Sequence, residues 1–171
     1  MPEAVRLGYE TAMNKKELVE AIVAELRGKV ERHMTAARAA HAEATHEESK
    51  AEDKYDTRGL EASYLAAGQA RQTAEAAAAL TDFAALFLKK FPQGEPIDVS
   101  ALVELETRKQ RLHYFIGPSA GGLEVEHDGH TVIVLTPQAP LGQQLVGKKA
   151  GDTFKFKVGP FTDDYAIISV I

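Results

Sequence analysis

The residues with the clearest chemical potential are carboxylates gathered near the middle of the N-terminal half of the chain. Residues 43–56 hold two lysines and a cluster of acids, namely Glu43, Glu47, Glu48, Glu52, Asp53 and Asp56. Carboxylate oxygens suit Mg²⁺, which prefers oxygen ligands and keeps several of its waters. The same side chains also commonly solvate a turn or a break in a helix. Their position in the fold therefore decides between the two interpretations.

Other residue types that could form a reactive centre do not group together. The absence of cysteine excludes disulfides, thiol catalysis and cysteine-based zinc sites. His33, His41 and His46 are separated by steps of eight and five, which is not the i, i+4 spacing of a helical metal pair. His127 and His130 flank an Asp-Gly turn and are interpreted as ordinary hairpin residues. We expect no metal site in the free protein and no cofactor of its own.

Composition and charge are those of an ordinary soluble protein. The chain has 171 residues, of which 44% are hydrophobic and 26% charged, and a formal net charge of −5. This charge gives no sign of a nucleic-acid coat or a membrane-surface binder. No apolar run approaches the roughly 18 residues of a membrane span, and the N-terminus lacks a signal-peptide core. We expect a cytoplasmic protein that makes no membrane contact.

The chain divides into two regions of different sequence character. Residues 1–91 contain no proline after Pro2 and are rich in alanine, glutamate and lysine, whereas residues 92–171 hold the other six prolines. The boundary sequence FPQGEPIDVS carries the proline and glycine signals that end a helix. We predict an α+β protein with a helical region over 1–91 and a second domain over 92–171.

The helical region is predicted to form an antiparallel coiled-coil hairpin. Asn14 and Glu17 resemble a capping box at its start. Steps of four and three separate the residues of an apolar stripe, Val19, Val23, Leu26, Val30, His33, Ala37, Ala40 and Ala44. A second helix over about residues 60–91 is similar in length, so the acidic cluster falls at the tip, near residues 48–56. Arms of about 35 residues would be roughly 50 Å long. A spacer or dimerisation rod is the alternative interpretation.

Residues 92–171 have the alternation and turn signals of a small antiparallel sheet domain. Strands are expected in SALVELET, in RLHYFIG and on both sides of the Asp-Gly turn in LEVEHDGHTVIVL. DTFKFKV alternates with period two, and YAIISVI is typical of a buried closing strand. A helical turn is expected near residues 143–146, and GPSAGG is assigned to a loop.

The segment TPQAPLGQQLVGKKAGD, followed by a strand and YAIISVI, resembles the C-terminal domain of the bacterial Gre transcription factors, GreA and GreB. The family pattern is matched at Thr136, Pro137, Pro140, Leu141, Gly142, Leu145, Gly147, Lys148, Gly151 and Asp152. Ala139 stands where the family usually has serine. With the N-terminal hairpin, the resemblance covers nearly the whole chain.

The resemblance implies a fold, a partner and an activity. The C-terminal domain would be FKBP-like and would dock on bacterial RNA polymerase, with Pro140, Leu141, Gly142 and Lys148 as docking residues. The hairpin would enter the secondary channel, where the factor stimulates cleavage at the 3′ end of backtracked nascent RNA. The chain would then be an accessory factor, not an enzyme, and the reaction would belong to the polymerase and its Mg²⁺. We expect a monomer, with a dimer as the alternative.

The resemblance also suggests which tip acids act on that metal. Aligning the family's Glu-Asn with Glu52 and Asp53 makes these two the first candidates, followed by Glu48 and Asp56. The same alignment places Ser49 where the family has an aspartate. A non-cleaving regulator that occludes the channel is therefore the alternative function. A peptidyl-prolyl isomerase or chaperone is a second alternative, suggested by the FKBP-like fold alone.

Two arginines on the hairpin are candidates for contact with RNA. If residue i lies opposite residue 108 − i, Arg38 lies close to Ala70 and Arg71. Such a basic patch could contact RNA phosphate or base. A solvated flank of the coiled coil is the plainer interpretation.

Overall fold

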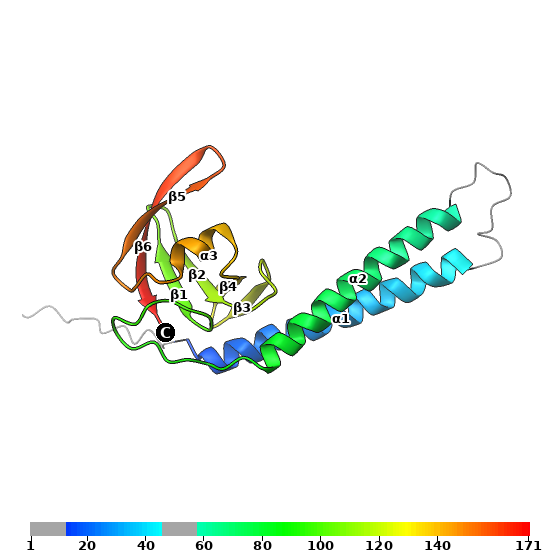
Figure 1. Cartoon of the computed structure of the whole chain (residues 1–171), viewed down its shortest axis with the longest axis horizontal. Coiled ribbons are helices and arrows are strands. Elements are labelled where there is room, and N and C mark those ends of the chain that lie inside the picture. The colour runs from blue at the N-terminus through cyan, green and yellow to red at the C-terminus, as the bar shows by residue number, and fades with distance from the viewer. Residues whose placement is uncertain (1–12, 46–57) are drawn as a thin grey trace, which may run out of the picture.

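The structure is a computed structural model that describes residues 13–45 and 58–171, and it joins a long helical hairpin to a small sheet domain (Figure 1). The hairpin consists of α1 (Lys15–Thr45) and α2 (Arg58–Ala84). The sheet domain contains β1 (Leu102–Glu106), β2 (Arg111–Ile116), β3 (Glu124–His127), β4 (His130–Leu135), α3 (Pro140–Leu145), β5 (Thr153–Val158) and β6 (Phe161–Val170). The predicted α+β class, with a hairpin ahead of a sheet, is confirmed.

Asn14 caps α1 as the sequence predicts. Its Oδ1 accepts hydrogen bonds from the backbone N–H groups of Lys16 and Glu17, at 3.1 and 3.4 Å. These groups would otherwise lack partners in the first turn of the helix. The Glu17 carboxylate accepts from the Asn14 side-chain amide at 2.9 Å, so it reaches back to the cap side chain.

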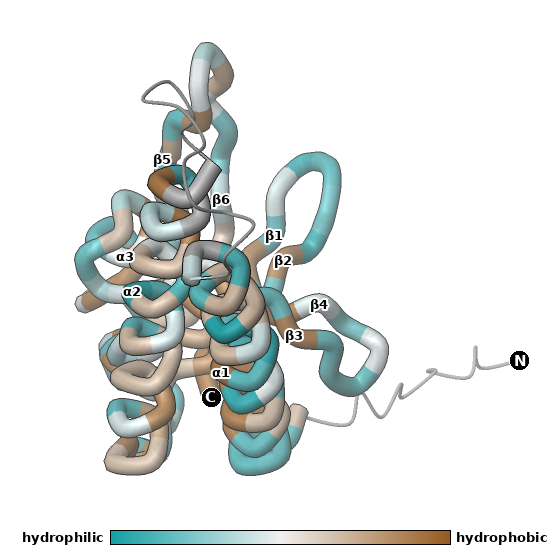
Figure 2. The backbone as a smooth tube through the Cα atoms, turned by 90° about the vertical axis from the view of Figure 1, so that its right-hand side faces the viewer, coloured by the Kyte–Doolittle hydropathy of each residue, from teal (hydrophilic) through white to brown (hydrophobic). Residues whose placement is uncertain are grey.

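The seam of α1 is shifted by one residue at the base of the hairpin. Leu18 and Ile22 are fully buried there, whereas the predicted seam residues Val19 and Val23 are only half-buried. The reason is that the base of α1 packs against the sheet as well as against α2, so that two adjacent helix faces are covered. Farther along the stem the apolar stripe predicted for a two-helix coiled coil does describe the seam, and its residue Ala40 is buried. In Figure 2, hydrophilic colour runs along much of α1.

The second helix is shorter than predicted. It ends at Ala84, and residues 85–101 form an extended connection into β1. Phe91, expected at the end of the helix, instead packs in the core of the sheet domain. No helix in the described part of the chain has a stretch long and apolar enough to cross a membrane.

The sheet is mixed, with strand order β3-β4-β2-β1-β6-β5. All pairs are antiparallel except β2 and β4, whose parallel register aligns His113 with Val132 and Ile116 with Leu135. The expectation of a purely antiparallel sheet is therefore corrected at this pair. The strand that follows β2 in the chain, β3, does not pair with β2. It lies one position farther out, and the β3–β4 turn places β4 between β2 and β3. Alternation in the sequence predicts which segments form strands, but it does not predict which strands are neighbours in the sheet.

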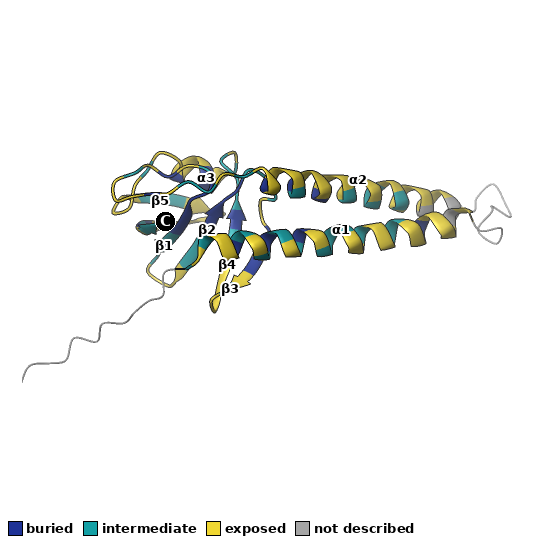
Figure 3. Ribbon diagram, turned by 90° about the horizontal axis from the view of Figure 1, so that it is seen from below, coloured by how far each residue is buried: buried dark blue, intermediate teal, exposed yellow. Residues whose placement is uncertain are grey.

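Two hydrophobic cores hold the molecule together. One joins the hairpin base to the sheet through Leu18, Ile22 and Phe83, which pack with Phe115 and Val134. The other lies within the sheet domain and includes Phe91, Leu105, Leu145 and Ile167. Burial is concentrated in the sheet and the hairpin base, while the outer stem is largely exposed (Figure 3).

Candidate functional site

The candidate tip acids Glu48, Glu52, Asp53 and Asp56 lie outside the described residues. The described arms end at Thr45 and Arg58, at the end of the hairpin remote from the sheet (Figure 1). His33 Nδ1 and Gln69 Oε1 lie 3.2 Å apart across the seam. Ala51 is midway between these two residues in the sequence, immediately before Glu52 and Asp53. The assignment of these acids to the tip remains a prediction.

The stem is narrow because its seam is built from small residues. Ala40, Ala76 and Ala79 are buried along it, with larger buried residues such as Leu26 toward the base, and alanine allows two helix backbones to approach closely. The outer part of α2 also carries the bulky residues Leu60 and Tyr64. They are 56% and 70% exposed, and the neighbouring Leu65 is 57% exposed. The outer part of α2 therefore presents apolar side chains to solvent.

One contact across the hairpin bears on the position of the candidate arginines. Since His33 lies opposite Gln69, residue i lies opposite about residue 102 − i, and Arg38 lies opposite about Tyr64. This contact differs from the register assumed from the sequence, and the predicted proximity of Arg38 to Arg71 stays a prediction. Arg71 forms an i, i+4 ion pair with Glu75 at 3.8 Å, and both side chains are exposed. Contact of either arginine with RNA stays a prediction.

The segment that resembles the Gre family has mainly architectural roles. Pro140 occupies the first position of α3 and is exposed, whereas Leu141 and Gly142 are buried. A Cβ on Gly142 would lie 2.0 Å from the carbonyl oxygen of Thr136, so only glycine fits there. Of the predicted docking residues, Leu141 and Gly142 help hold α3 in place, and their part in docking stays a prediction.

The remaining motif residues shape the turn that leads into β5. Gly147 and Gly151 have φ of +87° and +92°, which strongly favour glycine. Asp152 Oδ2 accepts a hydrogen bond from the Lys149 N–H at 2.8 Å and closes the turn. Lys148 is half-buried, and its Nζ lies 5.9 Å from the centre of the Phe154 ring.

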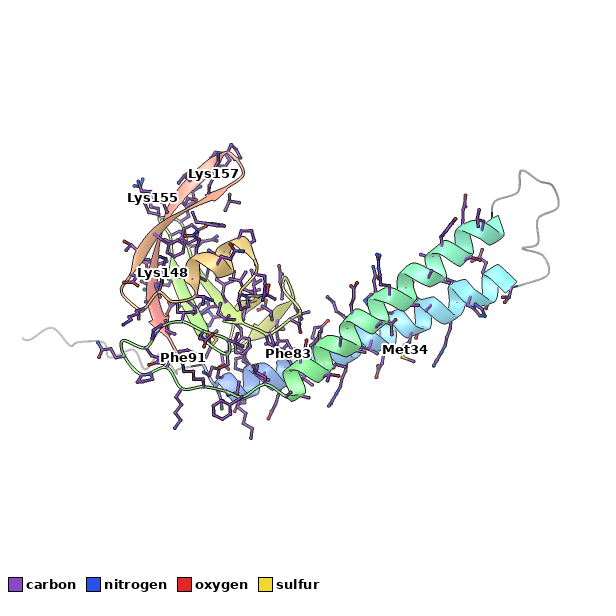
Figure 4. All side chains as sticks on the ribbon, in the orientation of Figure 1. Met34, Phe83, Phe91, Lys148, Lys155 and Lys157 are labelled. Atoms are coloured by element: carbon purple, nitrogen blue, oxygen red, sulfur yellow. The ribbon has the colours of Figure 1, made fainter. Side chains whose placement is uncertain are left out.

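The junction between hairpin and sheet contains a partly buried lysine. Lys15 Nζ donates a hydrogen bond to the Lys89 carbonyl oxygen and lies 4.8 Å from the centre of the Phe91 ring. Burial lowers the pKa of Lys15 to about 8. In the same connection, Ser100 Oγ accepts from the Lys89 N–H at 2.9 Å. These contacts fasten the start of α1 to the chain that leaves α2; Figure 4 shows Phe83 and Phe91 at this junction.

A cleft of about 670 Å³ lies where the stem meets the loop predicted from GPSAGG. The stem contributes Lys29, His33 and Asp82, and the loop contributes residues 119–122. Ser119 Oγ is buried without a hydrogen-bond partner among the described residues. The lining has no aromatic ring other than the imidazole of His33. Across residues 13–45 and 58–171, no three His, Cys, Asp or Glu side chains group as metal ligands.

No protein-family profile matches the chain, and no curated protein sequence matches it. Among solved structures it is similar to GreA factor homolog 1 (Gfh1) of Thermus thermophilus, with 19% identity and a TM-score of 0.36 over 87% of this chain and 94% of that one. It is similar to Gfh1 of Thermus aquaticus, with 18% identity and a TM-score of 0.38 over 91% and 93% of the two chains. It is also similar to the elongation factor GreA/GreB from Nitrosomonas europaea, with 17% identity and a TM-score of 0.35 over 64% and 91%. Solved structures similar to this chain thus include both Gfh1 and GreA/GreB factors.

Proposed function

We propose that this chain is an accessory transcription factor of Gre type that binds bacterial RNA polymerase and inserts its hairpin into the secondary channel. The observation that carries the proposal is a long, narrow hairpin anchored through a hydrophobic core to a domain containing the Gre-like segment. The 31 residues of α1 span about 47 Å, a suitable length for a probe. Because the base of the hairpin is fixed to this domain, docking of the domain would determine where the far end of the hairpin lies.

The candidate acids would act on the polymerase's own metal chemistry. Hydrolysis of a phosphodiester by two metals uses a second Mg²⁺ opposite the first. Glu52 and Asp53 would supply carboxylate ligands for that ion, and Glu48 and Asp56 are the next candidates. On this proposal the factor stimulates cleavage of backtracked RNA and contributes no active site of its own.

A cleavage assay on a stalled, backtracked elongation complex tests this activity. Added wild-type protein is expected to release short 3′ fragments of the nascent RNA at moderate Mg²⁺. Glu52→Ala and Asp53→Ala are expected to lose most of this stimulation, while Glu43→Ala, five residues from the nearest candidate acid, serves as the matched control. Stimulation that survives both tip substitutions would reject these residues as metal ligands.

A non-cleaving regulator is the second candidate function. Ser49 occupies the position of the family's aspartate, so the tip has a hydroxyl where cleavage chemistry uses a carboxylate. Slower nucleotide addition without any 3′ fragment would select this function. Ser49→Asp would then be the informative variant, because it restores the missing carboxylate.

The isomerase alternative has less structural support. The cleft at the hairpin base is lined largely by alanine, glycine and polar residues, whereas a proline-binding pocket needs apolar and aromatic walls. A proline-isomerisation assay on a short peptide checks this directly. Catalysis well above the uncatalysed rate would restore the alternative.

A further inference from the structure

The seam between the two arms of the stem holds one polar residue from each arm. His33 lies seven residues after Leu26 and seven before Ala40, and both of these neighbours are buried. On the other arm, Gln69 lies seven residues before Ala76, which is also buried. Residues seven apart in a coiled coil face the partner helix in the same way. His33 and Gln69 therefore occupy seam positions at which the neighbouring heptads have apolar residues.

These two polar side chains meet each other. His33 Nδ1 and Gln69 Oε1 form a hydrogen bond of 3.2 Å between α1 and α2, and both residues are half-buried. Thr73, the next half-buried residue of α2, instead donates its hydroxyl to the Gln69 carbonyl oxygen of its own helix, at 2.8 Å. A polar group at a seam position lowers the stability of a coiled coil, but it can fix the register of the helices.

Apolar contacts hold the alignment of the arms only weakly beyond the base. Large side chains such as Phe83 pack in the core at the base, whereas the outer stem is largely exposed (Figure 3). Because alanine is small, rotation or a shift of one arm against the other changes little apolar burial in the alanine seam. The same movement breaks the hydrogen bond between His33 and Gln69, because hydrogen bonds depend steeply on distance and angle. Two half-buried polar groups would then lack a partner.

We propose that the His33–Gln69 hydrogen bond aligns the two arms of the stem beyond the base, so that the far end of the hairpin has one defined position. On the proposed function, these two are positioning residues, which affect the polymerase only through the candidate acids Glu52 and Asp53. This consequence for activity rests on the proposed function, whereas the alignment of the arms does not.

Spin labels on the full-length protein measure the alignment directly. The chain has no cysteine, so Ala39→Cys and Ala67→Cys supply one labelling site on each arm. Both alanines are exposed and lie on the side of the contact away from the sheet. Pulsed electron paramagnetic resonance should give one narrow distance distribution for this labelled protein. Adding His33→Leu/Gln69→Leu should widen the distribution about twofold or more, because an apolar pair accepts several alignments.

The stability of the same variant distinguishes alignment from a merely structural role. Replacement of both polar partners by leucine should leave the Tm unchanged or raise it, because no polar group is left unpaired. The effect of the protein on RNA polymerase, whether cleavage or slower nucleotide addition, should nevertheless fall about tenfold or more, because misplaced reacting groups lose most of their rate. Loss of activity together with retained stability is the signature of a positioning contact.

Two further variants serve as controls. The exchange His33→Gln/Gln69→His can form the hydrogen bond in the opposite direction, and it should restore both the narrow distribution and the activity. Thr73→Val removes a half-buried hydroxyl that bonds within its own helix, so it should leave the distribution as it is in the labelled protein.

The outcomes separate this inference from the proposed function. An unchanged distribution in His33→Leu/Gln69→Leu, or equal widening in Thr73→Val, would overturn the alignment by this contact whatever the polymerase assay shows. A widened distribution in the leucine variant, combined with a wild-type protein that has no effect on polymerase, would support the alignment and overturn the proposed function. Activity that survives a widened distribution would overturn the assignment of His33 and Gln69 as positioning residues.

Discussion

The hairpin stem and the sheet domain bury their residues in contrasting ways. Most of the described stem beyond its base is exposed, and alanines form its buried seam. The sheet domain encloses large side chains, among them Phe115, Leu105 and Ile167. A helix needs only internal hydrogen bonds and a narrow apolar stripe, whereas a sheet needs a covered face. The stem can therefore be slender, provided that its base is held by the better packed domain.

The largest expected effect comes from removing the contact that anchors the stem. Phe83 is 3% exposed, and its ring centre lies 6.3 Å from that of Phe115. Phe83→Ala should lower the free energy of unfolding by about 3–5 kcal/mol, through lost burial and the cavity left behind. Urea denaturation followed by circular dichroism measures this change. Phe87→Ala, at an exposed site, should change stability by less than about 0.5 kcal/mol; equal losses would contradict the anchoring role of Phe83.

A glycine-to-alanine change should have opposite signs in the two regions. Gly142→Ala places a Cβ against the Thr136 carbonyl oxygen and should destabilise the sheet domain by about 1–3 kcal/mol or more. Gly68 lies within α2 with nothing within 4 Å of an added Cβ. Gly68→Ala should stabilise the stem by about 0.5–1 kcal/mol, because alanine has the higher helix propensity. Thermal unfolding of both variants gives the comparison, and a destabilised Gly68→Ala would show that the stem is more tightly packed than its exposure indicates.

The smallest expected effect is a pH dependence at the junction. Because burial lowers the pKa of Lys15 to about 8 from 10.5, the unfolded chain binds more protons between these two values. Unfolding free energy should therefore rise as the pH increases from about 8 to 10.5. Partial solvent exposure of Lys15 limits the gain to about 1 kcal/mol.

The variant Lys15→Met isolates this contribution from other groups that titrate in the same range. Burial raises the pKa of Tyr114, which acts in the opposite direction because the folded state then retains its proton longer as the pH rises. Stability curves of wild type and Lys15→Met should differ in slope only above about pH 8. Parallel curves over this window would show that Lys15 is not buried in solution.

Local patterns predicted most of the helices and strands, but not where α2 ends or how the two arms of the hairpin align. Asn14 was recognisable as a cap, and the Asp-Gly turn placed β3 and β4, because both signals act within a few residues. The end of α2 was misplaced because Phe91 has the same apolar signal in a helix as in a sheet core. The partner of Arg38 on the second arm was not readable from the sequence, because hairpin register depends on contacts between the arms, such as that of His33 with Gln69.

The candidate site was likewise predicted in part: its residue types were recognisable in the sequence, but their burial in the fold was not. The Gre-like segment was found from its residue types, and the structure shows why several are needed: Gly142 fits against the Thr136 carbonyl, and Gly147 and Gly151 adopt positive φ. Which of these residues reach the surface was not readable from the motif, because burial of Leu141 depends on the strands beneath it. The exposure of Val158 and Phe161, which lie opposite each other in β5 and β6, was missed for the same reason, since strand alternation alone predicts a buried face.

The sequence by itself determined the two-part organisation, the helical and strand segments, and the concentration of acids between the two helices. Those features depend on local propensity, periodicity and the placement of proline and glycine. Only the tertiary structure decided that the base of α1 has two covered faces, that β2 and β4 run parallel, and that Val158 and Phe161 are exposed. Each of these depends on which distant segment lies alongside, and no local pattern encodes that choice.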